Sequence, residues 1–201
     1  MSDKLDRIIK TAEDKGGLIK SSEIEKLGNS RVYISELVDS GLLIREARGI
    51  YSVRGEEPDE FAVIQKRSAK LIYSYGTALF FHDLTDRVPG IIDITVPQGY
   101  NVSRIADSNE RLRFHYVKGD IFLAGVETVL TPQGYEVAAY SKERCICDLI
   151  KGKRNVDKQL YTQALQRYFD GHFKQRELIS MARIIGVEQS VRDYMEVLQK
   201  Q

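Results

Sequence analysis

The stretch from Ser21 to Val53 constrains the fold more than any other part of this sequence. Its first segment, SSEIEKLG, is typical of a short helix that Ser21 or Ser22 caps. Gly28 ends that segment, because glycine tolerates the left-handed conformation found after helices. The apolar spacing that follows predicts a second helix over residues 29–40. Two helices joined by a tight turn are therefore expected here.

An apolar hairpin is predicted directly after these helices, over residues 41–53, with its turn at residues 45–48. An amphipathic helix is predicted before them, over residues 3–15, and residues 18–20 can add a third strand to the hairpin. Three helices and a small sheet in this order predict a winged helix-turn-helix over residues 1–57.

A polar segment around Pro58 separates this module from a second patterned region, and we place a domain boundary there. Residues 58–201 are predicted to form a mixed α/β domain with a small sheet in the middle and a helical end. The fold class is thus α+β. Strands are predicted within residues 91–97, 111–117, 121–130 and 135–140, and helices over 59–75, from 77, and over 141–153, 156–169, 174–185 and 188–200.

Composition is that of an ordinary globular protein, with 42% hydrophobic and 29% charged residues. The formal net charge of +1 implies that any nucleic-acid site is a local patch. The two cysteines, Cys145 and Cys147, stand at a spacing that suits neither a disulfide nor a metal pair, which favours reduced, packed thiols. With no apolar run of membrane-spanning length, we expect a cytoplasmic protein that does not associate with membranes.

Double-stranded DNA is the partner that the helix-turn-helix pattern predicts. Residues at the front of a recognition helix enter the major groove first, and an arginine there can contact guanine in a bidentate manner. Arginines in the wing can reach phosphates or the minor groove, although exposed hairpin turns also favour arginine. The predicted DNA-contact residues of this module are Lys20, Ser22, Asn29, Ser30, Arg31, Tyr33, Arg45 and Arg48.

A second basic stretch lies between residues 142 and 158, which contains six lysines and arginines but only three acidic residues. Such a strip would lengthen the DNA footprint and steepen its salt dependence. A solvated surface explains the same charges equally well. The candidate contacts in this stretch are Lys142, Arg144, Lys151, Lys153 and Arg154.

The residues available for catalysis do not form a recognisable site. Gly76-Thr77 followed by Asp93 faintly resembles a nucleotidyl-transfer motif, but the second carboxylate that would hold two metals is missing. No phosphate-binding loop, HExxH motif or nucleophile elbow occurs, and His82 is interpreted as a helix-end residue. We therefore expect no enzyme activity, no metal and no cofactor.

Three segments in this order resemble AbiEi-type antitoxins of bacterial type IV abortive-infection toxin–antitoxin systems: GLLIREARGIY, TALFFHDLTDRVPGIIDITVP and SKERCICDLIKGK. The resemblance covers nearly the whole chain. It implies an N-terminal winged helix-turn-helix that binds inverted repeats in its own promoter and represses the operon. It also implies a C-terminal domain that neutralises a nucleotidyltransferase-like toxin in phage defence, without a stable complex. A lapsed nucleotidyltransferase and a protein-interaction module without DNA binding are the alternatives.

Overall fold

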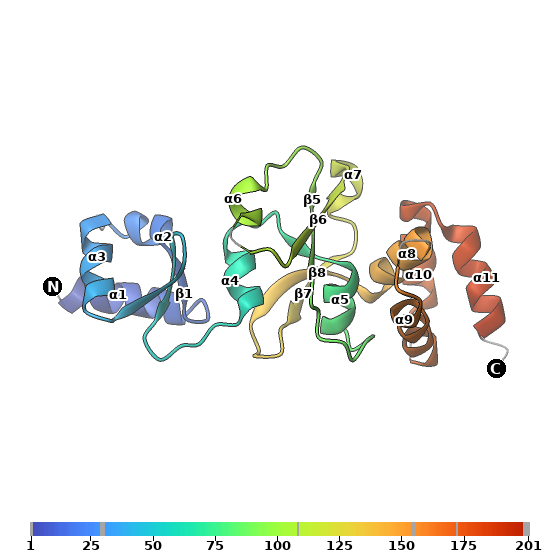
Figure 1. The fold of residues 1–201 in the computed structure, drawn as a ribbon, viewed down its shortest axis with the longest axis horizontal. Coiled ribbons are helices and arrows are strands. Elements are labelled where there is room, and N and C mark those ends of the chain that lie inside the picture. Colours follow the sequence, from blue (N-terminus) through green and yellow to red (C-terminus); the bar gives the residue numbers. More distant parts are fainter. Residues whose placement is uncertain (1, 29–30, 108, 154–155, 172, 199–201) are drawn as a thin grey trace. The chain divides into compact units, whose positions relative to one another are not determined.

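The computed structural model of the chain describes residues 2–28, 31–107, 109–153, 156–171 and 173–198, without the side chains at 2–4, 31, 32 and 198 (Figure 1). It divides into two compact units. The first unit comprises Met1–Ala69 and Leu130–Val137, and the second comprises Lys70–Val129 and Ala138–Gln201. The domain boundary expected after residue 57 stays a prediction.

The first unit has the order of elements that the sequence predicts for a winged helix-turn-helix. These elements are α1 (Ser2–Glu13), β1 (Leu18–Lys20), α2 (Ser21–Lys26), α3 (Arg31–Asp39), β2 (Leu43–Ala47) and β3 (Ile50–Val53). The unit also contains α4 (Glu60–Lys66), which was predicted to begin the second domain. The three strands form an antiparallel sheet in the order β1-β3-β2. The third strand expected at residues 18–20 is confirmed, and the α+β class with it.

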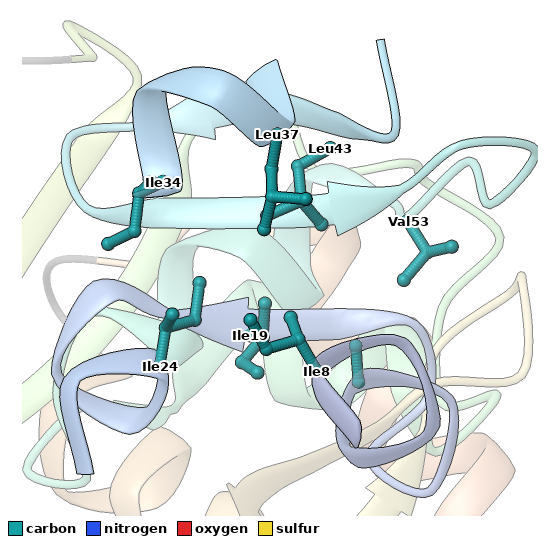
Figure 2. Close-up of a cluster of buried hydrophobic side chains, with 8 residues drawn as sticks. Ile8, Ile19, Ile24, Ile34, Leu37, Leu43 and Val53 are labelled. Carbon is teal, nitrogen blue, oxygen red and sulfur yellow. The ribbon is translucent and has the colours of Figure 1, made fainter. Parts of the chain in front are cut away.

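One apolar core holds these helices against the sheet. Figure 2 shows that every one of α1, α2, α3 and the three strands contributes a side chain to it. Its labelled members are Ile8, Ile19, Ile24, Ile34, Leu37, Leu43 and Val53, all with at most 9% of their surface exposed. Burial of branched aliphatic side chains at this density contributes about 1.5–3 kcal/mol each, so this core defines the unit.

The opposite face of the small sheet is also covered. Leu18 and Ile50 form a second buried cluster with Ala62 of α4, and Tyr135 packs against it from the segment 130–137. Helix α4 is capped by Asp59, whose carboxylate accepts a 2.7 Å hydrogen bond from the main-chain N–H of Ala62. Helix α4 and the segment 130–137, which is distant in the sequence, therefore cover this face of the small sheet.

The second unit is built on a five-stranded sheet in the order β6-β5-β4-β8-β7. Strands β5 and β6 pair in parallel, as do β4 and β8, whereas β4 and β5 are antiparallel. The strands are β4 (Ile72–Tyr73), β5 (Ile92–Pro97), β6 (Leu112–Val117), β7 (Val126–Leu130) and β8 (Glu136–Tyr140).

The helices of this unit lie between its strands and after the last of them. They are α5 (Tyr75–Phe81), α6 (Ser103–Ala106), α7 (Gly119–Phe122), α8 (Lys142–Gly152), α9 (Lys158–Asp170), α10 (Gln175–Ile185) and α11 (Glu188–Leu198). Helix α8 begins where it was predicted, with the Ser141 hydroxyl accepting from the main-chain N–H of Arg144. No described helix combines the length and the apolar character needed to cross a bilayer.

The helix predicted over residues 59–75 is wrong in its second half. Helix α4 ends at Lys66, and Ile72-Tyr73 forms the central strand β4 instead. Both side chains are almost fully buried, and a β-branched residue next to an aromatic one suits a strand flanked on both sides. Pairing with β5 and β8 has therefore outweighed the helical spacing of the local sequence.

Candidate nucleic-acid interface

The wing and the start of α2 are joined through the main chain. The N–H of Ser21 donates a 3.0 Å hydrogen bond to the carbonyl oxygen of Gly49, at the tip of the β2–β3 hairpin. This bond brings the segment around Lys20 and Ser22 next to Arg48. Lys20 is partly exposed, and Ser22 and Arg48 are exposed. Three of the predicted DNA-contact residues thus gather at one end of the small sheet.

The cap of α2 differs from the one predicted. Lys20 occupies the N-cap position, and Ser21 is the first helical residue. Glu23 reaches back from the first turn, and its Oε2 accepts a 2.8 Å hydrogen bond from the main-chain N–H of Lys20. The carboxylate of the third helical residue therefore binds the N–H of the N-cap residue, as in one half of a capping box, and neither Ser21 nor Ser22 occupies the cap position.

Helix α3 occupies the recognition-helix position. Ile34 and Leu37 face the core with 5% and 4% exposure. Tyr33 is half-buried and packs against the same core, so only part of its ring faces outward. Asn29 and Ser30 lie outside the described residues, as does the side chain of Arg31. Their predicted contacts with bases stay predictions.

The wing is longer in its strands and shorter in its turn than predicted. Arg45 lies within β2 opposite Tyr51, and a bulge follows it before Ala47 pairs with Ile50. Bulges re-aim side chains and increase local twist. Arg45 and Arg48 are both exposed, so both remain available to a polyanion. Between them, Glu46 accepts a 2.6 Å hydrogen bond from Ser52.

Two lysines that the sequence-based interpretation did not include interact electrostatically with Glu23. Lys15 forms an ion pair with Glu23, and Lys66 of α4 interacts electrostatically with Glu23, Lys15 and Lys20. Burial acts to raise the pKa of Glu23, but the hydrogen bonds from Lys15 and Lys20 hold it below its usual value. Only the packing of α4 could have identified Lys66, because it stands far along the chain from Lys20.

The basic stretch of the second unit needs one correction. Arg144 was predicted to contact DNA, but it is 1% exposed. Its guanidinium bonds Asp148 and the carbonyl oxygens of Ile121 and Ala124, each at 2.9 Å, and lies over the ring of Tyr140. A side chain so fully satisfied inside the fold is a structural anchor, and it cannot reach a phosphate.

The remaining charges of that stretch are exposed at Lys142, Lys151 and Lys153, while Arg154 lies outside the described residues. Lys142 and Lys151 are nine positions apart in α8, which places them on faces about half a turn apart. The Lys151 ammonium also donates a 3.0 Å hydrogen bond to the carbonyl oxygen of Ile185, at the end of α10. These lysines do not line one face of the helix, and their contact with DNA stays a prediction.

Asp93, the residue that raised the enzyme alternative, is 2% exposed. Its Oδ1 accepts hydrogen bonds from Arg113 Nε at 2.6 Å and from His115 Nε2 at 2.7 Å, and its Oδ2 accepts one from Arg113 Nη2 at 2.9 Å. Burial acts to raise the pKa of Asp93, but the bonds from His115 and Arg113 outweigh it and lower that pKa. Both carboxylate oxygens are thus already held by nitrogen donors from the neighbouring strand β6.

Other polar residues of the second unit have structural partners. Tyr75 has a φ of 45° and packs its ring 4.2 Å from that of His115. His82 ends α5, as predicted, and its Nε2 lies 2.7 Å from the carbonyl oxygen of Tyr140.

Among the described residues, no group of three or more His, Cys, Asp and Glu side chains could hold a metal ion. Cys145 and Cys147 are both buried free thiols.

Comparison with known proteins supports the interpretation of the first unit. Residues 6–54 match the family model described as "Transcriptional regulator, AbiEi antitoxin". The fold is similar to that of the RV2827C protein from Mycobacterium tuberculosis, with a TM-score of 0.53 and 13% identity over 96% of this chain and 81% of that one. At that identity the likeness concerns the fold alone. No curated protein matches the chain. Residues 6–54 are therefore similar to AbiEi-type antitoxins that act as transcriptional regulators.

Proposed function

We propose that this chain is an antitoxin that binds inverted repeats in its own promoter through the winged unit and represses its operon. The observation that carries the proposal is the Ser21–Gly49 hydrogen bond, which holds the wing tip beside the start of α2. It gathers Lys20, Ser22 and Arg48 at one end of the sheet, in the part of the chain that matches the family model. Such a surface fits a DNA backbone.

The roles of the residues follow from how helix-turn-helix modules dock. The recognition helix α3 would enter the major groove with its first residues, so the proposed base contacts are Arg31 and the two residues before it in the sequence, Asn29 and Ser30. Arg45 and Arg48 of the wing contact phosphates or the minor groove beside it. Tyr33 contributes only through the exposed part of its ring.

Inverted repeats would supply the second copy that a module of this size needs. A single DNA-binding module buries about 600–1,000 Å², which is usually too little for tight binding alone. Two copies on half-sites related by a two-fold axis double that area. We therefore propose cooperative binding of two chains to one operator.

The antitoxin activity is assigned to the second unit and directed against a nucleotidyltransferase-like toxin in phage abortive infection, without a stable complex. The alternative of a nucleotidyltransferase in this chain loses support at Asp93. Its two oxygens are bound by Arg113 and His115, whereas two-metal chemistry needs carboxylate oxygens free for the ions.

Fluorescence anisotropy with labelled duplexes tests the DNA proposal. The full chain is titrated into its own upstream DNA and into a scrambled duplex of equal length, at several salt concentrations. We expect cooperative binding of the upstream DNA and at least about a thousandfold preference for it at matched salt. Equal affinity for both duplexes would refute the proposal and leave a module that binds proteins.

The antitoxin proposal is tested separately, by expressing the chain together with the product of the adjacent gene. If that product is a nucleotidyltransferase-like toxin, co-expression should restore growth, and size-exclusion chromatography of the mixture should give two separate peaks. Growth arrest in the presence of the full chain would count against the antitoxin role, and one shared peak would contradict the absence of a stable complex.

A further inference from the structure

A turn from the middle of the chain packs on the back of the wing. It connects β7 with β8 and lies within the segment 130–137, which belongs to the first unit. The main-chain N–H of Thr131 donates a 2.9 Å hydrogen bond to the carbonyl oxygen of Tyr135, and the N–H of Tyr135 donates a 3.1 Å bond to the Thr131 hydroxyl. Tyr135 is therefore carried by a turn that is closed by its own hydrogen bonds.

The side chain of Tyr135 packs against the second buried cluster of the unit, on the face of the small sheet that α4 also covers. Ile50 belongs to that cluster, and Ala47 packs against it. These two residues pair at the end of the β2–β3 hairpin, with Arg48 and Gly49 between them. We call Arg48-Gly49 the wing turn. Both residues that flank the wing turn thus lie in the apolar contact that Tyr135 covers.

The wing turn is also the place where the wing meets α2. The carbonyl oxygen of Gly49 accepts the hydrogen bond from Ser21, and Ile50 is the next residue along the chain. A Cβ added to Gly16, in the turn before β1, would lie 3.6 Å from the Tyr135 ring. Loss of the ring would leave a cavity behind these segments, and residues that line a cavity relax partly into it. A shift of Ile50 would move the carbonyl that Ser21 binds.

We infer that Tyr135 is a positioning residue for the wing. Its ring holds the wing turn where Gly49 bonds α2 and where Arg48 is presented to DNA. The role toward DNA rests on the proposed function, whereas the placement of the wing turn does not. The winged module is then discontinuous in the sequence, because a turn that follows β7 completes it.

Amide hydrogen exchange of the full chain without DNA tests the placement. Tyr135→Ala should lower the protection of the Ser21 amide by about tenfold or more and leave that of the Leu42 amide, which donates to Leu37, unchanged. Tyr135→Phe should retain protection at Ser21, because the ring rather than the hydroxyl packs. Tyr116→Ala, at an exposed tyrosine of the second unit, is the matched control. Should Tyr135→Ala not fold, Tyr135→Leu serves for the same comparison.

A general loss of stability would lower the protection at Ser21 and at Leu42 alike. Equal losses at the two amides would mean that Tyr135 only supports the fold, and would overturn the inference. Unchanged protection at Ser21 in the Ala or Leu variant would overturn it as well, because the wing turn would then keep its place without the ring.

A pair of double-variant comparisons tests the role toward DNA. Arg48→Gln should flatten the slope of log K against log salt by about one unit in the wild-type background, and by clearly less in the Tyr135→Ala background. Arg31→Ala, in the recognition helix, should reduce operator binding by the same factor in both backgrounds. A full effect of Arg48→Gln without Tyr135 would overturn the positioning role. Failure of the wild type to prefer its operator would instead refute the proposed function, and the exchange at Ser21 would still decide the placement of the wing turn.

Discussion

The main-chain N–H of Ser21 and the carbonyl oxygen of Gly49 are 3.0 Å apart, and this hydrogen bond ties the helix-turn-helix to the wing. Gly49 has a φ of 73°, which lets the hairpin turn tightly enough for its carbonyl to face α2. The two elements that we propose to face DNA are thereby held together in the free protein. DNA binding by them would lose less conformational entropy, because their relative placement exists before DNA arrives.

Gly49→Ala should weaken DNA binding and stability together. The added Cβ would lie 3.1 Å from the Ser21 hydroxyl, in a backbone conformation that costs an L-residue about 1–2 kcal/mol. We expect that loss in chemical unfolding of the full chain. Gly90→Ala is the control, because a Cβ there meets open space. A variant with wild-type affinity and stability would mean that the wing tip is not held as described.

Arg31→Ala should reduce specific binding by about 1–3 kcal/mol and change non-specific binding little. The reason is its place at the start of α3, where a bidentate contact with guanine is possible. Competition between operator and scrambled DNA measures the difference directly. Equal losses on the two duplexes would make Arg31 a phosphate contact.

Local patterns predicted the first unit well, because its elements are short-range and amphipathic. The positions of α3, of the third strand and of α8 followed from apolar spacing and from the serine before α8. The burial and the partners of single charged side chains could not be predicted, because they depend on residues far away in the sequence. Arg144 is buried because its guanidinium donates to the carbonyl oxygens of Ile121 and Ala124, which lie 20 or more positions away in the sequence.

The ion pair of Asp93 should make stability depend on pH in the acidic range. Its folded pKa is below the value of about 3.9 of a free aspartate, so its contribution is complete above that value and is lost as pH falls through the folded pKa. Asp93→Asn should cost about 1–2 kcal/mol near neutral pH, a modest figure because the Arg113 side chain is 58% exposed. Urea unfolding from about pH 7 to about pH 3 should show the difference shrinking. The exposed Asp107→Asn is the control, and a pH-independent difference would contradict the assignment.

Asp93 should not support catalysis. Isothermal titration of the full chain with magnesium or manganese and a nucleotide is expected to show no binding linked to Asp93, because Arg113 and His115 occupy its oxygens. A clear heat signal that Asp93→Asn abolishes would revive the nucleotidyltransferase alternative. Arg113→Gln offers a second check, since it frees one side of the carboxylate without removing it.

The last prediction concerns the basic residues at and after the end of α8. Lys153 follows the helix directly, Arg154 is the next residue in the sequence, and the Lys151 ammonium donates a hydrogen bond to the carbonyl oxygen of Ile185. A lysine that already donates to the protein gains less from a phosphate than a free one does. Neutralising Lys151, Lys153 and Arg154 together should flatten the slope of log K against log salt by up to roughly three units. Because Lys151 is expected to contribute least, the Lys153/Arg154 double variant should show most of this change.

Lys142→Gln serves as the comparison for that triple variant, because Lys142 lies at the other end of α8, about half a turn around its axis. If one DNA duplex contacts the end of α8, the triple variant should change the slope and Lys142→Gln should not. Contacts from the second unit would add more binding free energy than bending the operator costs. Removing these contacts should therefore also reduce cooperativity in the triple variant. Identical slopes and cooperativity for wild type and triple variant would mean that these charges form a solvated surface, and that the winged unit alone contacts DNA.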